Sequence, residues 1–351
     1  MRQAEPGPAP ERDTDAARGR AARGPRQIPR SGWIDIAWRT AREVQADDLA
    51  TVARSIAFSG MLALFPALGA FVSVYGLFAD VATARDHLAG LTGVVPASAM
   101  ALLGEQMVRL ASASQANLSL AFVFGLGLSV WSANAGMKAL FKGLNVVYEE
   151  KEKRSFLKLN LISLAFTLGT VLFLALAMAA LVALPVALDF LHVDPGLIGL
   201  SHLRWPALLL IATLFLSVVY RYGPSREKPK WRWVTPGGAA AGVLWMAGSA
   251  LFSWYLTRFA DYDATYGSLG AVFGFMTWLW LSSTVVLIGA ELNAEIEHQT
   301  AADSTAGAEQ PLGVRGANMA DTVGEPIPSI RPPWRRRRLS PDARLRSAAS
   351  R

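Results

Sequence analysis

The sequence predicts an all-α membrane protein with six transmembrane helices and both termini in the cytoplasm. Only 17% of its 351 residues are charged and 52% are hydrophobic, whereas a soluble globular domain carries about 25% charged residues. Six windows of 16 to 30 residues contain no Asp, Glu, Lys or Arg, and roughly 20 apolar residues are enough to span hydrocarbon. The windows are residues 55–79, 118–137, 159–188, 205–220, 236–257 and 269–290.

The continuous apolar character of the windows indicates helices. A strand of a membrane barrel alternates apolar and polar residues, whereas these windows do not, and a helix satisfies its backbone hydrogen bonds within the segment. The third window has 30 residues, so at about 1.5 Å per residue it exceeds a bilayer core of roughly 30 Å. It should therefore tilt, or break near Pro185.

The distribution of basic residues predicts the orientation. Residues 1–54 contain 10 Lys and Arg, the five successive gaps contain 2, 6, 1, 5 and 1, and the chain after residue 290 contains 9. Because positively charged flanks resist translocation, the segments rich in Lys and Arg are expected on the cytoplasmic side. Six crossings then leave both termini there.

The remaining segments are predicted from composition and pattern. Residues 1–32 and 299–351 have no core-forming pattern and are expected to be disordered cytoplasmic tails, the second of them basic. Residues 33–50 predict an amphipathic helix, which either lies on the inner membrane surface or packs under the helix bundle. Residues 84–115 predict an external helical hairpin.

The start of the fifth window predicts an interfacial belt. Trp231 and Trp233 alternate with basic residues, as is typical of the boundary between membrane and water. Thr235 followed by Pro236 predicts the N-cap and first residue of the helix.

A polar ladder is expected at the cytoplasmic end of the second window. Asn134, Lys138 and Asn145 are 4 and 7 residues apart, so they share one face of a continuing helix, and Ser132 lies just before them. These side chains either anchor the helix end at headgroup level or form a gate or substrate contact.

A second group of candidate positions belongs to the sixth window. Glu291 and Asn293 lie at its cytoplasmic end, and Glu291 is expected to pair with Lys138 or Lys142, because charge near hydrocarbon persists chiefly when paired. Tyr266 lies at the outer entrance, where tyrosine is either a belt residue or part of a gate.

Composition and motifs argue against enzymatic chemistry. The chain has no cysteine, and its four histidines lie far apart outside the windows, so no metal site, disulfide or thiol chemistry is expected and no cofactor is implied. No phosphate-binding glycine loop, paired-histidine helix or nucleophile elbow occurs. The windows contain no Asp, Glu, Lys, Arg or His, so none is expected in mid-membrane, which disfavours a proton relay or an ion pump.

Several motifs together resemble those of one family of bacterial inner-membrane proteins. They are Ala57-Phe58 to Leu64-Phe65-Pro66, Ser132-Ala133-Asn134, Leu144-Asn145-Val146-Val147-Tyr148, Lys151 to Phe156, Tyr262, Tyr266-Gly267-Ser268-Leu269-Gly270-Ala271 and Gly289-Ala290-Glu291-Leu292-Asn293-Ala294-Glu295. Over roughly residues 35–298 the chain is similar to the YihY/BrkB family, once labelled ribonuclease BN. The resemblance implies six spanning helices and a role in the cell envelope or virulence.

Three functions are open at this stage. The protein could handle or translocate a lipid-like or amphipathic envelope component, with anionic membrane lipids as partners. It could instead be a structural or regulatory envelope protein that transports nothing. Ribonuclease activity, the old family label, has less support, because no cluster of carboxylates or histidines can hold catalytic metal ions. No nucleic-acid partner is expected, and the sequence does not define an oligomeric state.

Overall fold

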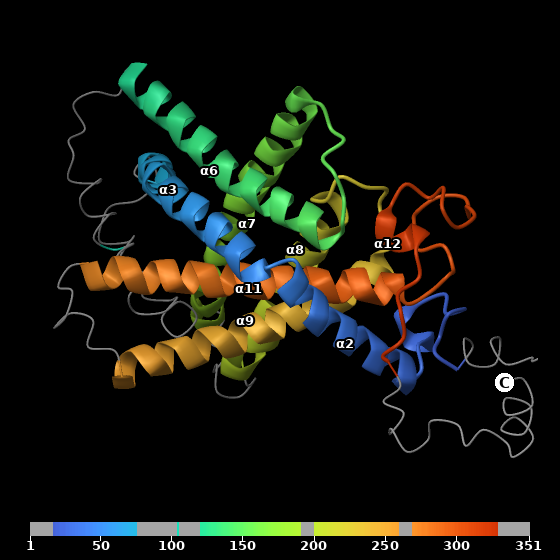
Figure 1. Ribbon diagram of the computed structural model, residues 1–351. Coiled ribbons are helices and arrows are strands. Elements are labelled where there is room, and N and C mark those ends of the chain that lie inside the picture. Colours follow the sequence, from blue (N-terminus) through green and yellow to red (C-terminus); the bar gives the residue numbers. More distant parts are fainter. Residues whose placement is uncertain (1–16, 76–103, 105–119, 191–199, 260–268, 329–351) are drawn as a thin grey trace, which may run out of the picture.

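The computed structural model describes residues 17–75, 104, 120–190, 200–259 and 269–328 (Figure 1). In this part of the chain the regular elements are helices. One isolated β-bridge also occurs, between Pro229 and Thr305. The helices are η1 (Pro25–Gln27), α2 (Arg30–Ala46), α3 (Leu49–Tyr75), α6 (Leu120–Val147), α7 (Phe156–Phe190), α8 (Leu200–Tyr222), α9 (Trp231–Phe259), α11 (Leu269–His298) and α12 (Asn318–Asp321).

Each charge-free window overlaps one long helix, in the same order along the chain. Within the described residues, three helical stretches are long and apolar enough to cross a membrane: Phe156–Phe173, Trp231–Arg258 and Val272–His298. Helix α7 continues for 35 residues, through Pro185 to Phe190, so the predicted break at the proline does not occur. The hairpin predicted at residues 84–115 lies outside the described residues, apart from Gly104.

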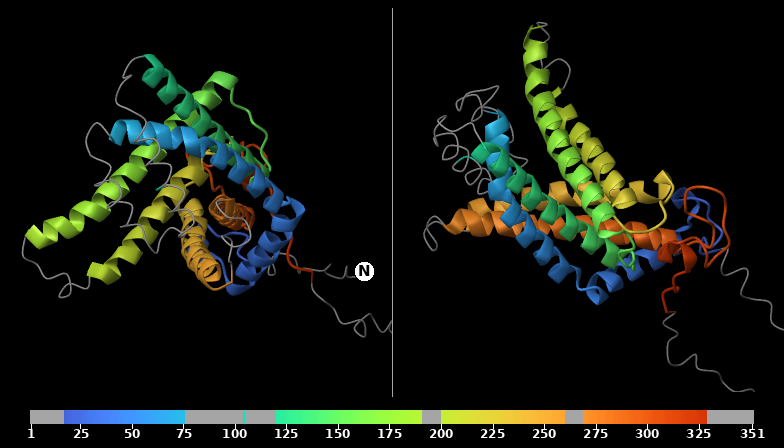
Figure 2. Two further views of the ribbon diagram at one scale, coloured as in Figure 1. Left: turned by 90° about the vertical axis from the view of Figure 1, so that its left-hand side faces the viewer. Right: turned by 90° about the horizontal axis from the view of Figure 1, so that it is seen from above.

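Helix α11 occupies the centre of the arrangement (Figures 1 and 2). It contacts α9, α3, α2 and α6, while α3 packs on α6, and α8 on α9. Helices α7 and α8 lean away from the other long helices, which gives the V shape seen in the right-hand view of Figure 2. The helices converge where α11 ends and the described terminal segments lie. We call this the polar end, because it holds Glu291, Asn293, Glu295 and Glu297 of α11.

The main apolar core lies next to the polar end. It brings together side chains from five helices and one loop, each at most 1% exposed. They are Leu49 and Ala53 of α3; Phe141, Leu144 and Val147 of α6; Tyr148 of the loop after α6; Val219 and Tyr220 of α8; Val234 of α9; and Leu287, Ala290 and Ala294 of α11. The core therefore ties the helices together at this one end.

Small residues let α9 and α11 approach closely. A Cβ added to Gly289 would lie 2.6 Å from Ala241 Cβ and 2.7 Å from the Tyr220 hydroxyl, and one added to Gly237 would overlap the Gly289 carbonyl. The Tyr220 hydroxyl donates a hydrogen bond of 2.7 Å to the Val286 carbonyl. The contact has no room for a side chain at either glycine, as is common where helices pack in lipid.

Helix α2 packs one face against the helix bundle, and its place at the inner membrane surface stays a prediction. Ile36 and Asp35 are fully buried and Arg39 is 2% exposed, because this face of α2 lies against α11. The helix ends at Ala46, four residues before the predicted limit. A turn at Asp47 and Asp48, the latter with φ 46°, leads directly into α3.

The N-terminal segment differs from the prediction of disorder. Ala22 and Ile28 are buried against Ile36 of α2, Trp233 of α9 and Ile296 of α11. For residues 17–32 the prediction of disorder is wrong. The segment has no core-forming pattern of its own, but its apolar side chains complete a core formed by α2, α9 and α11.

The C-terminal segment is also ordered as far as residue 328. Ala301 N–H donates to the Arg20 carbonyl and Gly324 N–H to the His298 carbonyl, both at 2.8 Å. Met319 of α12 is 2% exposed and packs on the main core. The disorder predicted for residues 299–328 is therefore wrong, for the same physical reason.

The start of α9 corrects the predicted belt and cap. The helix begins at Trp231, and Pro236 lies inside it. Trp231 is 46% exposed, as a belt residue would be, but Trp233 is 1% exposed and belongs to the core formed with Ile36. Thr235 donates a hydrogen bond back to the Trp231 carbonyl at 2.8 Å, so it does not cap the helix.

The ion pair between Arg39 and Glu295 gives the first prediction. Replacing Arg39 by Met should lower the free energy of unfolding by about 3–5 kcal/mol, because it leaves a buried carboxylate without its partner. Arg42→Met is the matched control on the same helix. The Arg42 side chain pairs with Glu43 but is 51% exposed, so loss of this pair should lower the free energy of unfolding by at most about 1 kcal/mol. SDS titration of the protein in detergent micelles measures both. Equal costs for the two variants would contradict the packing described for α2.

Candidate functional site

The polar end concentrates ionisable side chains that are withdrawn from water. Glu291, Asn293, Glu295 and Glu297 are each 1% exposed, although they lie near the carboxyl end of α11, where the helix dipole disfavours negative charge. A buried carboxylate is costly unless it is paired or hydrogen-bonded. The partners of these residues therefore define the site.

Glu295 is neutralised by α2. The Arg39 guanidinium pairs with the Glu295 carboxylate and donates to the Glu295 carbonyl at 3.2 Å. It also donates to Gln299 Oε1 at 2.7 Å and to the Glu325 carbonyl at 2.9 Å. One arginine thus fastens α2, the last turn of α11 and the C-terminal segment together.

Asp35, one turn away along α2, joins this helix to both terminal segments. Arg18 donates to both of its oxygens, at 2.7 and 2.8 Å, and the Ile327 N–H donates at 3.0 Å. Burial alone would raise the pKa of Asp35, but these hydrogen bonds and the charges of Arg18 and Arg39 lower it. The carboxylate form is therefore the one the fold stabilises.

Glu297 is neutralised by the loop between α8 and α9. Arg226 pairs with it at 2.6 Å, and both side chains are at most 2% exposed. The same guanidinium lies 4.5 Å from the centre of the Tyr148 ring, and Ser304 donates to the other Glu297 oxygen at 2.5 Å. Burial alone would lower the pKa of Arg226, but the charge and hydrogen bond of Glu297, together with the nearby Tyr148 and Glu150, raise it.

Asn293 forms hydrogen bonds with backbone groups of α9 on both sides of Pro236. Pro236 has no N–H and opens the helix locally. The Asn293 side chain donates to the Val234 carbonyl at 2.8 Å and accepts from the Gly237 N–H at 2.7 Å. Asn293 is therefore a structural link between α9 and α11, and the close approach at Gly237 makes it possible.

Asn145 links three segments at the end of α6. Its amide oxygen accepts from the Ser225 N–H at 2.8 Å, and its amide nitrogen donates to Glu152 at 3.1 Å. Arg154 pairs with Glu152 at 2.7 Å and donates to the Gly223 carbonyl at 2.9 Å. The loop after α6 and the loop after α8 are thus joined through one asparagine.

The other polar positions predicted on α6 behave separately. Lys138 does not pair with Glu291: it donates to Asn160 of α7 at 3.0 Å and lies 5.3 Å from the Trp131 ring centre. Asn134 is buried, Ser132 is half-buried and Lys142 is exposed. The predicted pair with Glu291 is wrong because the Lys138 side chain bonds α7 rather than α11. Tyr266 lies outside the described residues.

Glu291 differs from its neighbours on α11. Among the described residues neither of its carboxylate oxygens has a hydrogen-bond partner, and the same holds for the Tyr148 hydroxyl. Within electrostatic reach of Glu291 lie the carboxyl groups of Glu295, Asp47, Glu43 and Glu149. Burial raises the pKa of Asp47 to about 6, and the charges of Glu43 and Glu149 act in the same direction.

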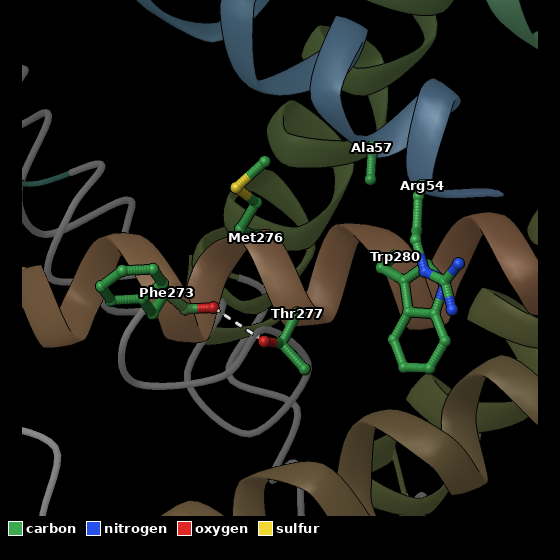
Figure 3. A pocket seen from close by; sticks show the side chains of 6 residues that line it. All are labelled: Arg54, Ala57, Phe273, Met276, Thr277 and Trp280. Carbon is green, nitrogen blue, oxygen red and sulfur yellow. Dashed lines mark hydrogen bonds between the residues drawn. The ribbon is translucent and has the colours of Figure 1, made fainter. Parts of the chain in front are cut away.

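A groove lies between α3 and α11 (Figure 3). Its volume is about 240 Å³, and its lining is Arg54 and Ala57 of α3 with Phe273, Met276, Thr277 and Trp280 of α11. The α11 residues follow the 3- and 4-residue spacing of one helix face. Trp280 donates to the Ala50 carbonyl at 3.1 Å and so holds the two helices together beside the groove.

Arg54 is the only charged residue of the groove lining. It lies five residues after the start of α3, or about 8 Å along the axis. Its hydrogen bond to Thr51 Oγ1, at 2.9 Å, uses one of the five N–H groups of the guanidinium. The side chain is exposed, so it can still bind an anion. Sequence reasoning missed Arg54 because it directly precedes the first window, where it was counted only as a topology signal.

Comparison with known proteins decides the family. The sequence model of the virulence factor BrkB family matches residues 40–312. The chain belongs to the BrkB family. No solved structure is significantly similar to it.

Relatives of this BrkB-family chain carry different names. The ribonuclease-like protein YfkH of Bacillus subtilis is 32% identical over 249 residues, which are 68% of this chain and 86% of YfkH. A UPF0761 membrane protein of Nitrosospira multiformis is 29% identical over 248 residues, 70% of this chain and 57% of that protein. Another, from Idiomarina loihiensis, is 30% identical over 196 residues, 55% and 68% of the two chains. With the long apolar helices, these relatives support a membrane location for the chain.

The Asn145 junction gives a prediction about pH. The hydrogen bond from Arg154 is the largest effect on Glu152 and lowers its pKa from 4.5 to about 2, against the effect of burial. A lowered pKa stabilises the fold fully above pH 4.5, and this contribution is lost as the pH falls toward 2. Glu152→Gln should therefore cost about 1 kcal/mol at pH 7, because this partly exposed pair is screened by solvent, and nothing near pH 2.

Thermal unfolding of wild type and variant across this pH range measures the difference. Glu309→Gln, at an exposed position of the C-terminal segment, is the control and should match wild type throughout. A cost for Glu152→Gln that does not change with pH would show that the carboxylate charge is not what stabilises the junction.

Proposed function

We propose that the protein is a six-span inner-membrane protein that handles an anionic, lipid-like component of the cell envelope at the groove between α3 and α11. In this proposal α3, α6, α7, α8, α9 and α11 cross the bilayer, and the polar end faces the cytoplasm with both termini. The excess of Lys and Arg in residues 138–158 and 221–235, which lie at the polar end, supports this orientation.

The groove is the observation that carries the proposal. An amphipathic anion needs a cationic contact for its headgroup and an apolar surface for its chain. Arg54 supplies the first, and Phe273, Met276 and Ala57 supply the second. An arginine near a helix end can extend its charged group to headgroup level while its stem stays in an apolar setting.

The other two functions have less support from the described residues. The name of the Bacillus relative suggests ribonuclease chemistry, yet within the described part of the chain no group of three His, Asp or Glu side chains could hold a metal ion. A purely structural envelope role predicts no dependence on Arg54 and is an outcome of the experiment below.

Arg54→Gln should weaken the retention of phosphatidylglycerol by about fivefold, since one basic side chain near an anionic membrane surface contributes about 1 kcal/mol. Native mass spectrometry of protein exchanged into mixed phosphatidylglycerol and phosphatidylcholine measures this ratio. Arg258→Gln is the control. Arg258 is also exposed, but it lies outside the groove lining, in the last turn of α9. Equal retention by wild type and Arg54→Gln would remove the groove from the proposal.

Translocation is tested separately in reconstituted vesicles. Wild-type protein should accelerate the movement of labelled phosphatidylglycerol between leaflets, and Arg54→Gln should slow this movement more than Arg258→Gln. If the wild type produces no acceleration over empty vesicles, the protein does not move this lipid and the structural role gains support.

A further inference from the structure

The seam between α6 and α7 carries a positive charge that no acidic side chain of the described residues balances. Lys138 of α6 is half-buried and donates a hydrogen bond of 3.0 Å to Asn160 Oδ1 of α7. Its ammonium group has three N–H donors, and among the described residues this is its one hydrogen bond, with no ion pair beside it. The other two donors are therefore left for a partner from outside the protein.

The Lys138 side chain directs its charge toward the apolar part of α6. Lys138 is the first residue after the charge-free window 118–137. Its ammonium lies 5.3 Å from the centre of the Trp131 ring, although Trp131 is seven residues, or about 10 Å, back along the helix. Because helical side chains lean toward the amino end, the charge lies at the edge of the window. Charge at this depth persists chiefly when it is paired.

Asn160 holds the ammonium group in this place without neutralising it. The Asn160 amide nitrogen donates to the Phe156 carbonyl at 2.7 Å, which turns the amide oxygen toward Lys138. Helix α7 begins at Phe156, so Asn160 lies in its second turn, near the end where the helix dipole favours an anion. The seam therefore orients a cation and leaves its countercharge to be supplied.

The outer surface of the seam combines more positive charge with exposed apolar side chains. Lys142, one turn after Lys138 on α6, and Lys158, in the first turn of α7, are both exposed, and neither has an ion pair among the described residues. The exposed apolar side chains are Trp131 (61%), Phe156 (77%), Leu157 (78%) and Leu161 (67%). This combination fits an anion that carries apolar chains better than it fits a soluble anion.

We propose that the α6–α7 seam, defined by Trp131, Lys138, Lys142 and Asn160, binds one anionic phospholipid of the inner leaflet. Lys138 and Lys142 are four residues apart and so are neighbours on the helix surface, where both contact the lipid phosphate. The acyl chains lie along the exposed apolar residues. The inference rests on the membrane orientation of the proposed function but not on the groove at Arg54, which lies between α3 and α11.

The bound lipid also strengthens the attachment of α7 to the bundle. Helix α7 leans away from the other long helices together with α8 (Figure 2), and it packs on α6, where the rings of Phe141 and Phe166 meet edge to face at 5.3 Å. A phosphate that contacts Lys138 holds in place the side chain that joins α6 to Asn160. The lipid is therefore expected to stay bound to the seam.

Fluorescence quenching by brominated lipids tests the proposal on the full-length protein in vesicles. Because the chain contains no cysteine, Leu161→Cys accepts a single fluorophore at an exposed position next to Asn160. Phosphatidylcholine is replaced stepwise by brominated phosphatidylglycerol or, as the reference, by brominated phosphatidylcholine. The phosphatidylglycerol should quench at lower mole fractions. Lys138→Gln should reduce this preference about fivefold, the contribution expected of one basic side chain at an anionic membrane surface.

Variants of the labelled protein separate the seam from other sources of charge. Lys138→Arg should keep the preference for phosphatidylglycerol. Lys142→Gln should reduce it, and this variant tests the site even if Lys138→Gln fails to fold. Lys151→Gln, at an exposed position in the loop after α6, is the matched control and should behave as the parent protein. Arg54→Gln should also leave the preference unchanged, because the groove is a different site.

Three results would overturn the proposal. One is equal quenching by the two brominated lipids, or a preference that survives in both Lys138→Gln and Lys142→Gln. Another is loss of the preference when inorganic phosphate is added to the buffer, which would show that the seam binds a soluble anion. The third is loss of the preference in Arg54→Gln, which would assign the lipid to the groove. Failure of Arg54→Gln to change lipid retention would count against the groove alone and leave the seam intact.

Discussion

The burial of charge at the polar end of α11 is the constraint on which the rest of the structure depends. A helix that ends in three glutamates within seven residues would ordinarily leave them in water. Here the last two turns are enclosed, so each carboxylate needs a compensating group. Arg39 on α2 and Arg226 in the loop after α8 provide two of them. The positions of α2, of that loop and of the terminal segments all follow from this requirement.

The described ends of the chain cooperate in this enclosure. Arg20 donates to the carbonyls of Gln299 and Gly324, and Arg315 donates to the carbonyls of Ala301 and Ala320. These backbone groups would otherwise be buried without partners. Segments with the composition of flexible tails are thus part of the folded unit at the polar end. The opposite ends of α3, α6 and α11 lie apart from those of α7 and α8 (Figure 2).

The sequence predicted the helices well and their partners poorly. Charge-free windows identify long helices because hydrocarbon excludes charge over a continuous stretch, a local property that can be read from composition. The position of Glu291 and Asn293 at one helix end is likewise local. Their contacts are not: Arg39 and Glu295 are 256 residues apart, and no periodicity connects them. Lys138 was the nearest basic residue in the topological scheme, but its side chain reaches α7. Asn293 was a candidate for anchoring the helix end or for a gate, and its side chain bonds the backbone of α9 on both sides of Pro236.

The central claim is that this enclosed end of the bundle lies in the cytoplasm. Because the chain contains no cysteine, a single introduced cysteine reports its own exposure without background. Lys151 is exposed in the loop after α6, beside the Asn145 junction, and Lys151→Cys can be treated with a membrane-impermeant maleimide in intact cells and after permeabilisation. The account predicts labelling only after permeabilisation. Labelling in intact cells would place the polar end outside and contradict the proposed topology.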